Sequence, residues 1–372
     1  MRRISAVCAV VVLGATIGLP AWGGDNLLPG VTLTVHRGSN GAWTRTSSPS
    51  PGGQAALYGV LALARTNVWA VGGRGRSQNE KPLVEHWNGA KWVVVASPAV
   101  AGGSWLRGVD GVSAHDVWAV GSLGGNAALI EHWNGSAWSV SQIPATPNAE
   151  LDAVDALAAN DVWAVGSRNG KTFTEHYDGT WHVVASPSRP GQNVLTGVAA
   201  VGPSDVWAVG GACCNNHPGT TLVEHWNGTK WSLVSSLNVG NQGSGLQAVS
   251  ASSAKNVTAV GDYLDGRGCL QTLVLQWNGS AWKRQSSPNA GPCDAQLLGV
   301  VRDGSNVWAV GQHVTSTHGT SSGFVLTHGA NGWKIAKSFA TAKHFNELVG
   351  VDVVPRSKNV WAVGLGTNDA AV

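Results

Sequence analysis

Short runs of β-branched, aromatic and small apolar residues recur along the chain, separated by turns rich in Gly, Ser, Asn and Asp. The most regular run is Asx-Val-Trp-Ala-Val-Gly, whose Trp is found at Trp69, Trp118, Trp163, Trp207, Trp308 and Trp361. A seventh copy has Thr258 in the Trp position. Successive copies are 44 to 53 residues apart, which is the period of propeller-type repeats. The pattern therefore predicts seven copies of one β unit.

Each unit predicts four short strands, which we name a to d in chain order. Strand a has the pattern Leu-x-Gly-Val, as at 106–112, and strand b is the Val-Trp-Ala-Val run. Strand c is typified by Thr-Leu-Val-Glu-His-Trp at 221–226. An Asn-Gly pair follows it and favours a hairpin turn, because both residues tolerate positive φ. Strand d starts at a Trp and ends at Ser-Pro, as at 92–98, where Pro suits the end of an outer edge strand.

The two ends of the chain are expected to share the last blade. The final Val-Trp copy ends at Gly364, with no c or d strand after it. Residues 32–36 and the turn leading to Trp43 supply the two missing strands, and Trp43 precedes Trp69 by 26 residues, close to the other d-to-b intervals. The sequence thus predicts an all-β protein with a single seven-bladed β-propeller of four-stranded antiparallel blades. Its closing blade combines N- and C-terminal strands, which leaves no open edge at the centre.

The repeat resembles the kelch-type propellers, which include the central domain of galactose oxidase. Gly72-Gly73 and Gly210-Gly211 match the kelch glycine doublet, and Tyr177-Asp178 with Trp181 is similar to the downstream part of that motif. In the other units the second Gly is replaced, and Trp stands in place of Tyr. The resemblance implies a fold rather than an activity. A copper site like that of galactose oxidase would need Tyr and His ligands and a Tyr–Cys crosslink, and we carry over no catalytic residue.

The first 23 residues predict a secretory signal peptide. Arg2 and Arg3 precede an apolar run at 4–19, which is followed by Pro20 and small residues. This is the order of a cleavable export signal, although an uncleaved anchor is the alternative. We therefore expect a propeller at 24–372 that is secreted, either extracellular or at the cell surface, and that has no membrane segment after cleavage.

Composition narrows the class of partner. Only 12% of residues are charged, and 24 basic residues face 21 acidic ones, so the basic surface that nucleic-acid binding requires is missing. Of the 19 Trp, 17 occupy repeated positions, which leaves Trp22 in the signal region and Trp105. Repeated residues, including four Glu-His pairs, are expected to be structural, because a catalytic group is needed only once.

The candidate binding residues lie outside the repeat pattern. The b–c and d–a loops open on one face and carry nearly all of the length variation, which is typical of functional loops. We name this the b–c/d–a face. Its non-repeated candidates are Trp105, His217, Asp262, Tyr263, Asp265, Arg267, His313 and His318.

The four cysteines of the mature chain also fall on the b–c/d–a face, and an exported protein can form disulfides. Cys269 and Cys293 are the expected bridge. Cys213 and Cys214 either form a vicinal pair, or one of them reaches across to another loop.

No metal or cofactor is expected, because the chain has no zinc, calcium or nucleophile-elbow motif. The sequence favours a monomeric, non-catalytic binding propeller whose partner is an extracellular glycan or protein. The alternative is an extracellular hydrolase, lyase or oxidase with its site at the channel mouth. Unpaired carboxylates or histidines converging at that mouth would favour the enzyme.

Overall fold

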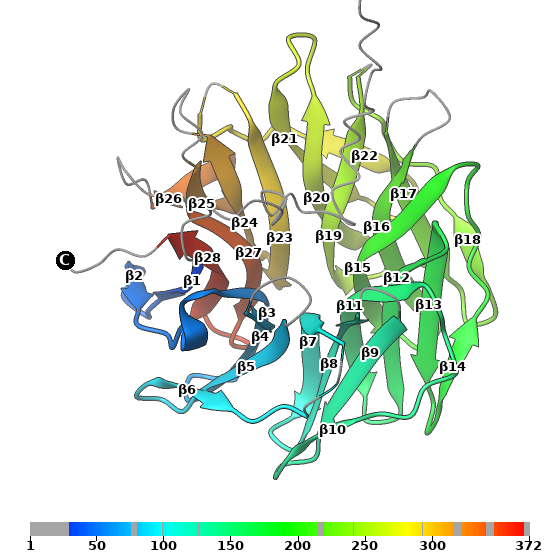
Figure 1. The fold of residues 1–372 in the computed structure, drawn as a ribbon. Coiled ribbons are helices and arrows are strands. Elements are labelled where there is room, and N and C mark those ends of the chain that lie inside the picture. The colour runs from blue at the N-terminus through cyan, green and yellow to red at the C-terminus, as the bar shows by residue number, and fades with distance from the viewer. Residues whose placement is uncertain are drawn as a thin grey trace, which may run out of the picture.

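The strands are arranged as seven sheets around a central channel (Figure 1). The computed structural model describes residues 30–75, 80–98, 100, 102–124, 127–213, 219–240, 242–291, 293–314, 321–339 and 346–367. These residues form 28 β-strands and one short 3-10 turn, η1 (Pro51–Gly53). Each sheet has four antiparallel strands in the order a, b, c, d, and neighbouring a strands contact each other around the ring. This confirms the predicted seven-bladed propeller.

The first three blades follow directly along the chain. Blade 1 consists of β3 (Ala55–Ala64), β4 (Asn67–Arg74), β5 (Lys81–Trp87) and β6 (Trp92–Val95). Blade 2 consists of β7 (Ser104–Ser113), β8 (Asp116–Leu123), β9 (Ala127–Trp133) and β10 (Trp138–Val140). Blade 3 consists of β11 (Ala149–Ala158), β12 (Asp161–Arg168), β13 (Lys171–Tyr177) and β14 (Trp181–Val184).

Blades 4 to 6 repeat this order. Blade 4 consists of β15 (Gln192–Gly202), β16 (Asp205–Cys213), β17 (Thr220–Trp226) and β18 (Trp231–Leu233). Blade 5 consists of β19 (Ser244–Ser253), β20 (Asn256–Leu264), β21 (Leu270–Trp277) and β22 (Trp282–Gln285). Blade 6 consists of β23 (Ala295–Asp303), β24 (Asn306–Val314), β25 (Ser321–Gly329) and β26 (Gly332–Ser338).

Blade 7 joins the two ends of the described chain, as predicted. Its strands are β27 (Asn346–Val353), β28 (Val360–Thr367), β1 (Gly30–Arg37) and β2 (Trp43–Thr46). β1 pairs with β28 along its whole length, from Gly30 opposite Thr367 to Arg37 opposite Val360. The b strands are longer than the Val-Trp-Ala-Val run suggested, so Asp262 and His313 lie in strands rather than in loops. In the part of the chain that the structure describes, no helix is long and apolar enough to cross a membrane.

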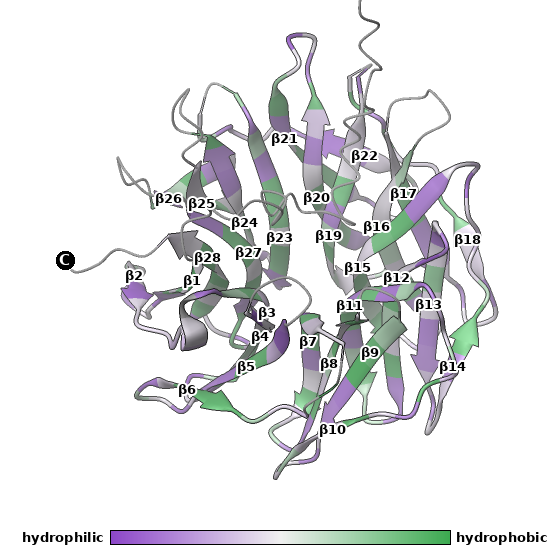
Figure 2. Cartoon of the chain, in the orientation of Figure 1, coloured by the Kyte–Doolittle hydropathy of each residue, from purple (hydrophilic) through white to green (hydrophobic). Residues whose placement is uncertain are grey.

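The core consists of seven apolar clusters, each of which lies between two neighbouring blades. We name each such interface between two blades a seam. At five seams the b-strand Trp inserts edge-on against the d-strand Trp of the next blade. Trp163 and Trp231 show the arrangement, with ring centroids 5.2 Å apart and planes at 90°. Such a pair contributes about 0.5–1.5 kcal/mol beyond its apolar area. Figure 2 shows the matching alternation of hydrophobic and hydrophilic stretches along the strands.

The repeated Glu-His pair of strand c also serves the seams. The His stacks on the Trp of its own blade and lies beside the Asx before that Trp: His132 is 4.0 Å from the Trp118 ring centroid, and its Nε2 is 2.7 Å from Asp116 Oδ1. In three of the four pairs the Glu accepts a hydrogen bond from a Ser of the preceding blade, as Glu224 does from Ser186 at 2.7 Å, whereas neither oxygen of Glu175 has a partner among the described residues. Both residues are therefore structural.

One seam, between blades 5 and 6, lacks the b-strand indole, although Trp333 of blade 6 packs against it. Thr258 stands in the Trp position, and Arg302 of blade 6 extends its guanidinium there, donating to Thr258 Oγ1 and to Gln276 Oε1 (3.2 Å). The positions equivalent to Arg302 in the other blades are small or β-branched: Ala62, Gly111, Ala156, Ala200, Ala251 and Val353. The Arg302 side chain thus fills the space that Thr258 leaves where the other blades have a Trp.

A double-mutant cycle tests this exchange. Thr258→Trp alone should overpack the seam and destabilise the protein by about 1–3 kcal/mol. Arg302→Ala alone should cost about 1–3 kcal/mol, because it leaves buried polar groups unpaired. The double variant should be more stable than the sum of the two losses implies, measured by denaturant unfolding followed by Trp fluorescence. Simple additivity of the two losses would contradict the exchange.

Candidate functional site

The central channel contains a cavity of about 230 Å³ lined by all seven a strands. Each blade contributes the residue between the repeated Leu and the following Gly or Ala, with its neighbours. These seven residues, which we name the channel ring, all differ: Tyr58, Arg107, Asp152, Thr196, Gln247, Leu298 and Val349. In a molecule built from repeats, this is the innermost position at which every blade differs.

A β-bulge places each of these residues in the channel. The pairing of strands a and b shifts at this point in every blade, for example between Leu57 and Gly59 in blade 1, so Tyr58 is the extra residue. The Gly that ends Val-Trp-Ala-Val-Gly makes room for the bulge: a Cβ on Gly72 would lie 1.9 Å from the carbonyl oxygen of Ala56. Bulges re-aim side chains and are frequent next to active sites.

The channel ring has a polar arc and an apolar arc. Tyr58, Arg107 and Asp152 come from blades 1 to 3, and Thr196 and Gln247 continue the polar arc in blades 4 and 5. Leu298 and Val349 make the apolar arc in blades 6 and 7. The charged pair is in contact, with Arg107 Nε 3.2 Å from Asp152 Oδ1, and the two side chains are 16% and 7% exposed.

Burial governs the ionisation of this arc. Burial raises the pKa of Asp152 to about 7, although Arg107 acts in the opposite direction. Burial also raises the pKa of Tyr58 to about 12, again opposed by Arg107, so the phenol is neutral and able to donate at physiological pH. The same burial raises the pKa of Glu80 and of Glu150, and Arg107 opposes the shift in both. One cation therefore balances several carboxyls.

Two further carboxyls are buried near the b–c/d–a ends of the strands. Glu347 is 2% exposed, and its Oε1 has no hydrogen-bond partner within the described ranges. Burial raises its pKa to about 7. Asp262 is fully buried, and burial raises its pKa to about 8 despite the adjacent Gln247 amide. Asp262 therefore lies beside a residue of the channel ring, and neither of its carboxylate oxygens has a hydrogen-bond partner of good geometry among the described residues.

The candidate residues predicted from the sequence lie in different structural environments. Trp105 lies in β7, half-buried against Gly73 of blade 1, rather than in a loop. His313 lies in β24 with its ring edge toward Phe324, and burial lowers its pKa. Tyr263 lies in β20, where its hydroxyl accepts a hydrogen bond from Arg284 at 2.7 Å. Two of the candidates, His217 and His318, lie outside the described residues, and so does Cys214, the neighbour of Cys213 in β16.

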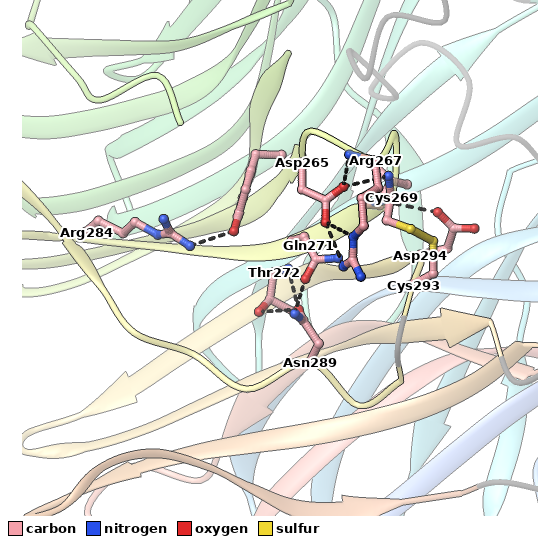
Figure 3. A network of polar contacts seen from close by, with 11 residues as sticks. Asp265, Arg267, Cys269, Gln271, Thr272, Arg284, Asn289, Cys293 and Asp294 are labelled. Carbon is pink, nitrogen blue, oxygen red and sulfur yellow. Dashed lines mark hydrogen bonds and ion pairs between the residues drawn. A yellow bond between two sulfur atoms is a disulfide. The ribbon is translucent and has the colours of Figure 1, made fainter. Parts of the chain in front are cut away.

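Asp265 and Arg267 organise the blade 5 loop around the expected disulfide (Figure 3). Asp265 accepts hydrogen bonds from Arg267 Nη2 at 2.8 Å and from the Cys269 amide at 3.1 Å. These bonds, first of all that from the Arg267 side chain, lower the pKa of Asp265. Cys269 is bonded to Cys293, whose Cα is 5.0 Å away, so the predicted bridge is present. It ties the b–c loop of blade 5 to the connection that leads into blade 6.

The described part of the chain contains no group of three or more His, Cys, Asp or Glu side chains able to hold a metal ion.

The channel ring was not predicted from the sequence. The signal was present, because the residue after the repeated Leu changes from blade to blade while its neighbours are nearly constant.

Comparisons with known proteins support the fold. No family model matches the chain, and no curated protein sequence matches it. Among solved structures, YCF48 bound to D1 peptide is similar to it at 12% identity and a TM-score of 0.55, covering 92% of this chain and 97% of the other. YCF48 from Cyanidioschyzon merolae gives 13% identity and 0.54, with 87% and 98% covered. A lectin of Aleuria aurantia in complex with Fucα1-6GlcNAc gives 14% identity and 0.50, with 77% and 96% covered.

These likenesses show a β-propeller and do not identify the kelch type, which remains a prediction from the repeat.

The buried carboxyls predict a pH-dependent stability. Eight have a pKa raised to between about 7 and about 8: Glu85, Glu131, Glu175, Glu224, Glu347, Asp152, Asp262 and Asp352. Because the folded protein holds these protons more tightly than the unfolded chain, its free energy of unfolding should fall from about pH 4.5 to about pH 8. Each group contributes at most about 1.4 kcal/mol per pH unit. Urea unfolding at pH 5, 6.5 and 8 measures this slope.

A matched pair of variants tests whether the buried carboxyls cause the pH dependence of the free energy of unfolding. Glu131→Gln keeps an oxygen to accept from Ser97 (2.9 Å) but cannot ionise, so it should flatten the slope. Asp178→Asn, at an exposed site with its side chain 58% accessible, should leave it unchanged. Stability that rises between pH 5 and 8 would show that these carboxyls are ionised in the folded protein.

Proposed function

We propose that the mature chain is an exported, non-catalytic binding protein that engages a glycan or a protein surface on the b–c/d–a face, where the channel opens. The observation that carries the proposal is the channel ring. Seams, turns and hairpins repeat from blade to blade, whereas this position differs in all seven and surrounds a cavity. Variation on a rigid scaffold is where recognition is normally located.

The similar structures agree with this class of function. One is described with a bound peptide and another with a bound fucosylated sugar. Their low identity limits the inference to what the propeller scaffold can support. The low charge of the chain, 12% of residues, also suits a neutral partner.

One observation favours the alternative of an extracellular hydrolase, lyase or oxidase. Asp152 has a pKa raised to about 7 and lies beside Arg107, in a cavity that Tyr58 also lines. A carboxyl in such a setting is able to act as a general acid or base. Turnover of a ligand found in the binding screen, lost in Asp152→Asn, would replace the binding proposal with this one.

The binding proposal is tested with the full-length protein purified from the medium and applied to glycan and peptide arrays. At least one ligand should bind, and Trp105→Ala, near the start of β7, should weaken it roughly tenfold or more. Val183→Ala on the outer strand β14, at a side chain that is 43% exposed, is the control and should bind normally. If neither array gives a ligand, or if both variants bind equally well, the proposed face is wrong.

Export itself is tested separately, because it depends on residues 1–23. Mass spectrometry of the exported protein should give an N-terminus near Gly24. Detection of intact Met1 in that protein would show that the segment is retained as an anchor.

A further inference from the structure

We infer that the channel cavity holds one neutral sugar ring, which a glycan presents end-on from the b–c/d–a face. This inference rests on the proposed function and narrows its ligand to one chemical class. It is carried by the cavity and by the side chains that face each other across it, not by the loops.

The cavity has the size of one ring. Its volume is about 230 Å³, whereas pockets for drug-sized ligands measure about 300–1,000 Å³. The backbones of neighbouring a strands pack closely in the cavity wall. A Cβ on Gly299 would lie 2.5 Å from the Val349 carbonyl oxygen, and one on Gly350 would lie 2.6 Å from that of Tyr58. A folded peptide segment is therefore too large for the channel.

The polar arc offers a donor and an acceptor side by side. Arg107 and Asp152 are in contact at 3.2 Å, yet Arg107 Nε, which is buried, has no hydrogen bond of good geometry among the described residues. Two adjacent hydroxyls match such a pair, because one can donate to the carboxylate while the other accepts from the guanidinium. The Tyr58 phenol and the Gln247 amide lie on the same lining and can serve further hydroxyls.

The apolar arc suits the other side of the ring. Leu298 and Val349 lie next to each other in the channel ring, with Val300 and Val351 following them on the same strands. A pyranose has a hydroxyl-bearing edge and a face of C–H groups, and burying that face against aliphatic side chains is favourable. A wholly polar ligand would leave this arc without a partner.

The charges favour a neutral ligand over an ion. A carboxylate or sulfate would meet Asp152, with Glu80 and Glu150 close enough to interact with Arg107. An ammonium or guanidinium would have to be desolvated next to Arg107. A polyol avoids both costs and uses the existing pair as it stands.

The inference is tested by titrating the full-length secreted protein with free D-mannose, D-galactose, N-acetyl-D-glucosamine and L-fucose in a calorimeter. N-acetyl-arginine amide serves as the cationic probe. At least one sugar should bind, with a Kd of roughly 1 mM or lower, and the arginine derivative should not. Asp152→Asn should weaken that sugar at least tenfold.

A second variant protects the test against misfolding. Val349→Phe leaves Arg107 and Asp152 in place but fills the cavity, and it should abolish sugar binding while the thermal midpoint stays within a few degrees of the parent. Val183→Ala is again the control and should bind as the parent does.

The outcomes separate the two proposals. Array binding that survives both Asp152→Asn and Val349→Phe would overturn the channel inference and leave the b–c/d–a face proposal standing. Binding of the arginine derivative in place of any sugar would also overturn it. If neither the arrays nor the free sugars bind, both proposals are wrong.

Discussion

The packing of a b-strand indole against the next blade, seen at five of the seven seams, is the interaction on which the ring depends. A single four-stranded blade has two apolar faces and cannot bury either alone. At five seams the b-strand Trp meets an aromatic of strand c and the Trp of strand d in the next blade, while its own His covers the remaining face. The Glu–Ser hydrogen bonds run along the same seams. Because an apolar cluster lies between each pair of neighbouring blades, the last seam has to be made by the blade that joins the two ends of the described chain.

The same repeat controls what reaches the channel. A glycine in strand b lets strand a bulge, and the bulged residue of each blade lies in the lining of the channel cavity. The scaffold positions this side chain but places little demand on its identity, since Arg107, Leu298 and Thr196 all occupy equivalent sites. Seam residues are packed among the apolar side chains of the next blade, whereas channel-ring residues line the cavity and meet the next blade through polar contacts, such as that of Arg107 with Asp152. The chemistry of the channel can therefore change without a change of fold.

Much of the fold was predictable, and the candidate site was not, for a physical reason. Period, turn residues and the incomplete last unit were sufficient to predict seven blades, the shared closing blade and the Cys269–Cys293 bridge. The channel ring could not be assigned from the alternation of buried and exposed side chains along strand a. The bulge after the repeated Leu breaks that two-residue period at this position. The partner of the repeated Glu was also hidden, since Ser48 and Glu85 meet only through packing of two blades. The exchange of Thr258 and Arg302 joins residues 44 positions apart and needs the register of both blades.

At the seam between blades 5 and 6, the packing of the blades and the loop chemistry of blade 5 act at the same place. It lacks the b-strand indole, and the Arg302 guanidinium with its hydrogen bonds occupies that position. A polar seam releases less free energy on closing than an aromatic one, because buried polar groups give up their hydration for each bond that they form. At the b–c/d–a end of this seam the Cys269–Cys293 bridge links blade 5 to the connection that enters blade 6. The covalent bond thus lies at the seam that lacks the b-strand indole, so the blade 5 loop with its disulfide reinforces the ring at this point.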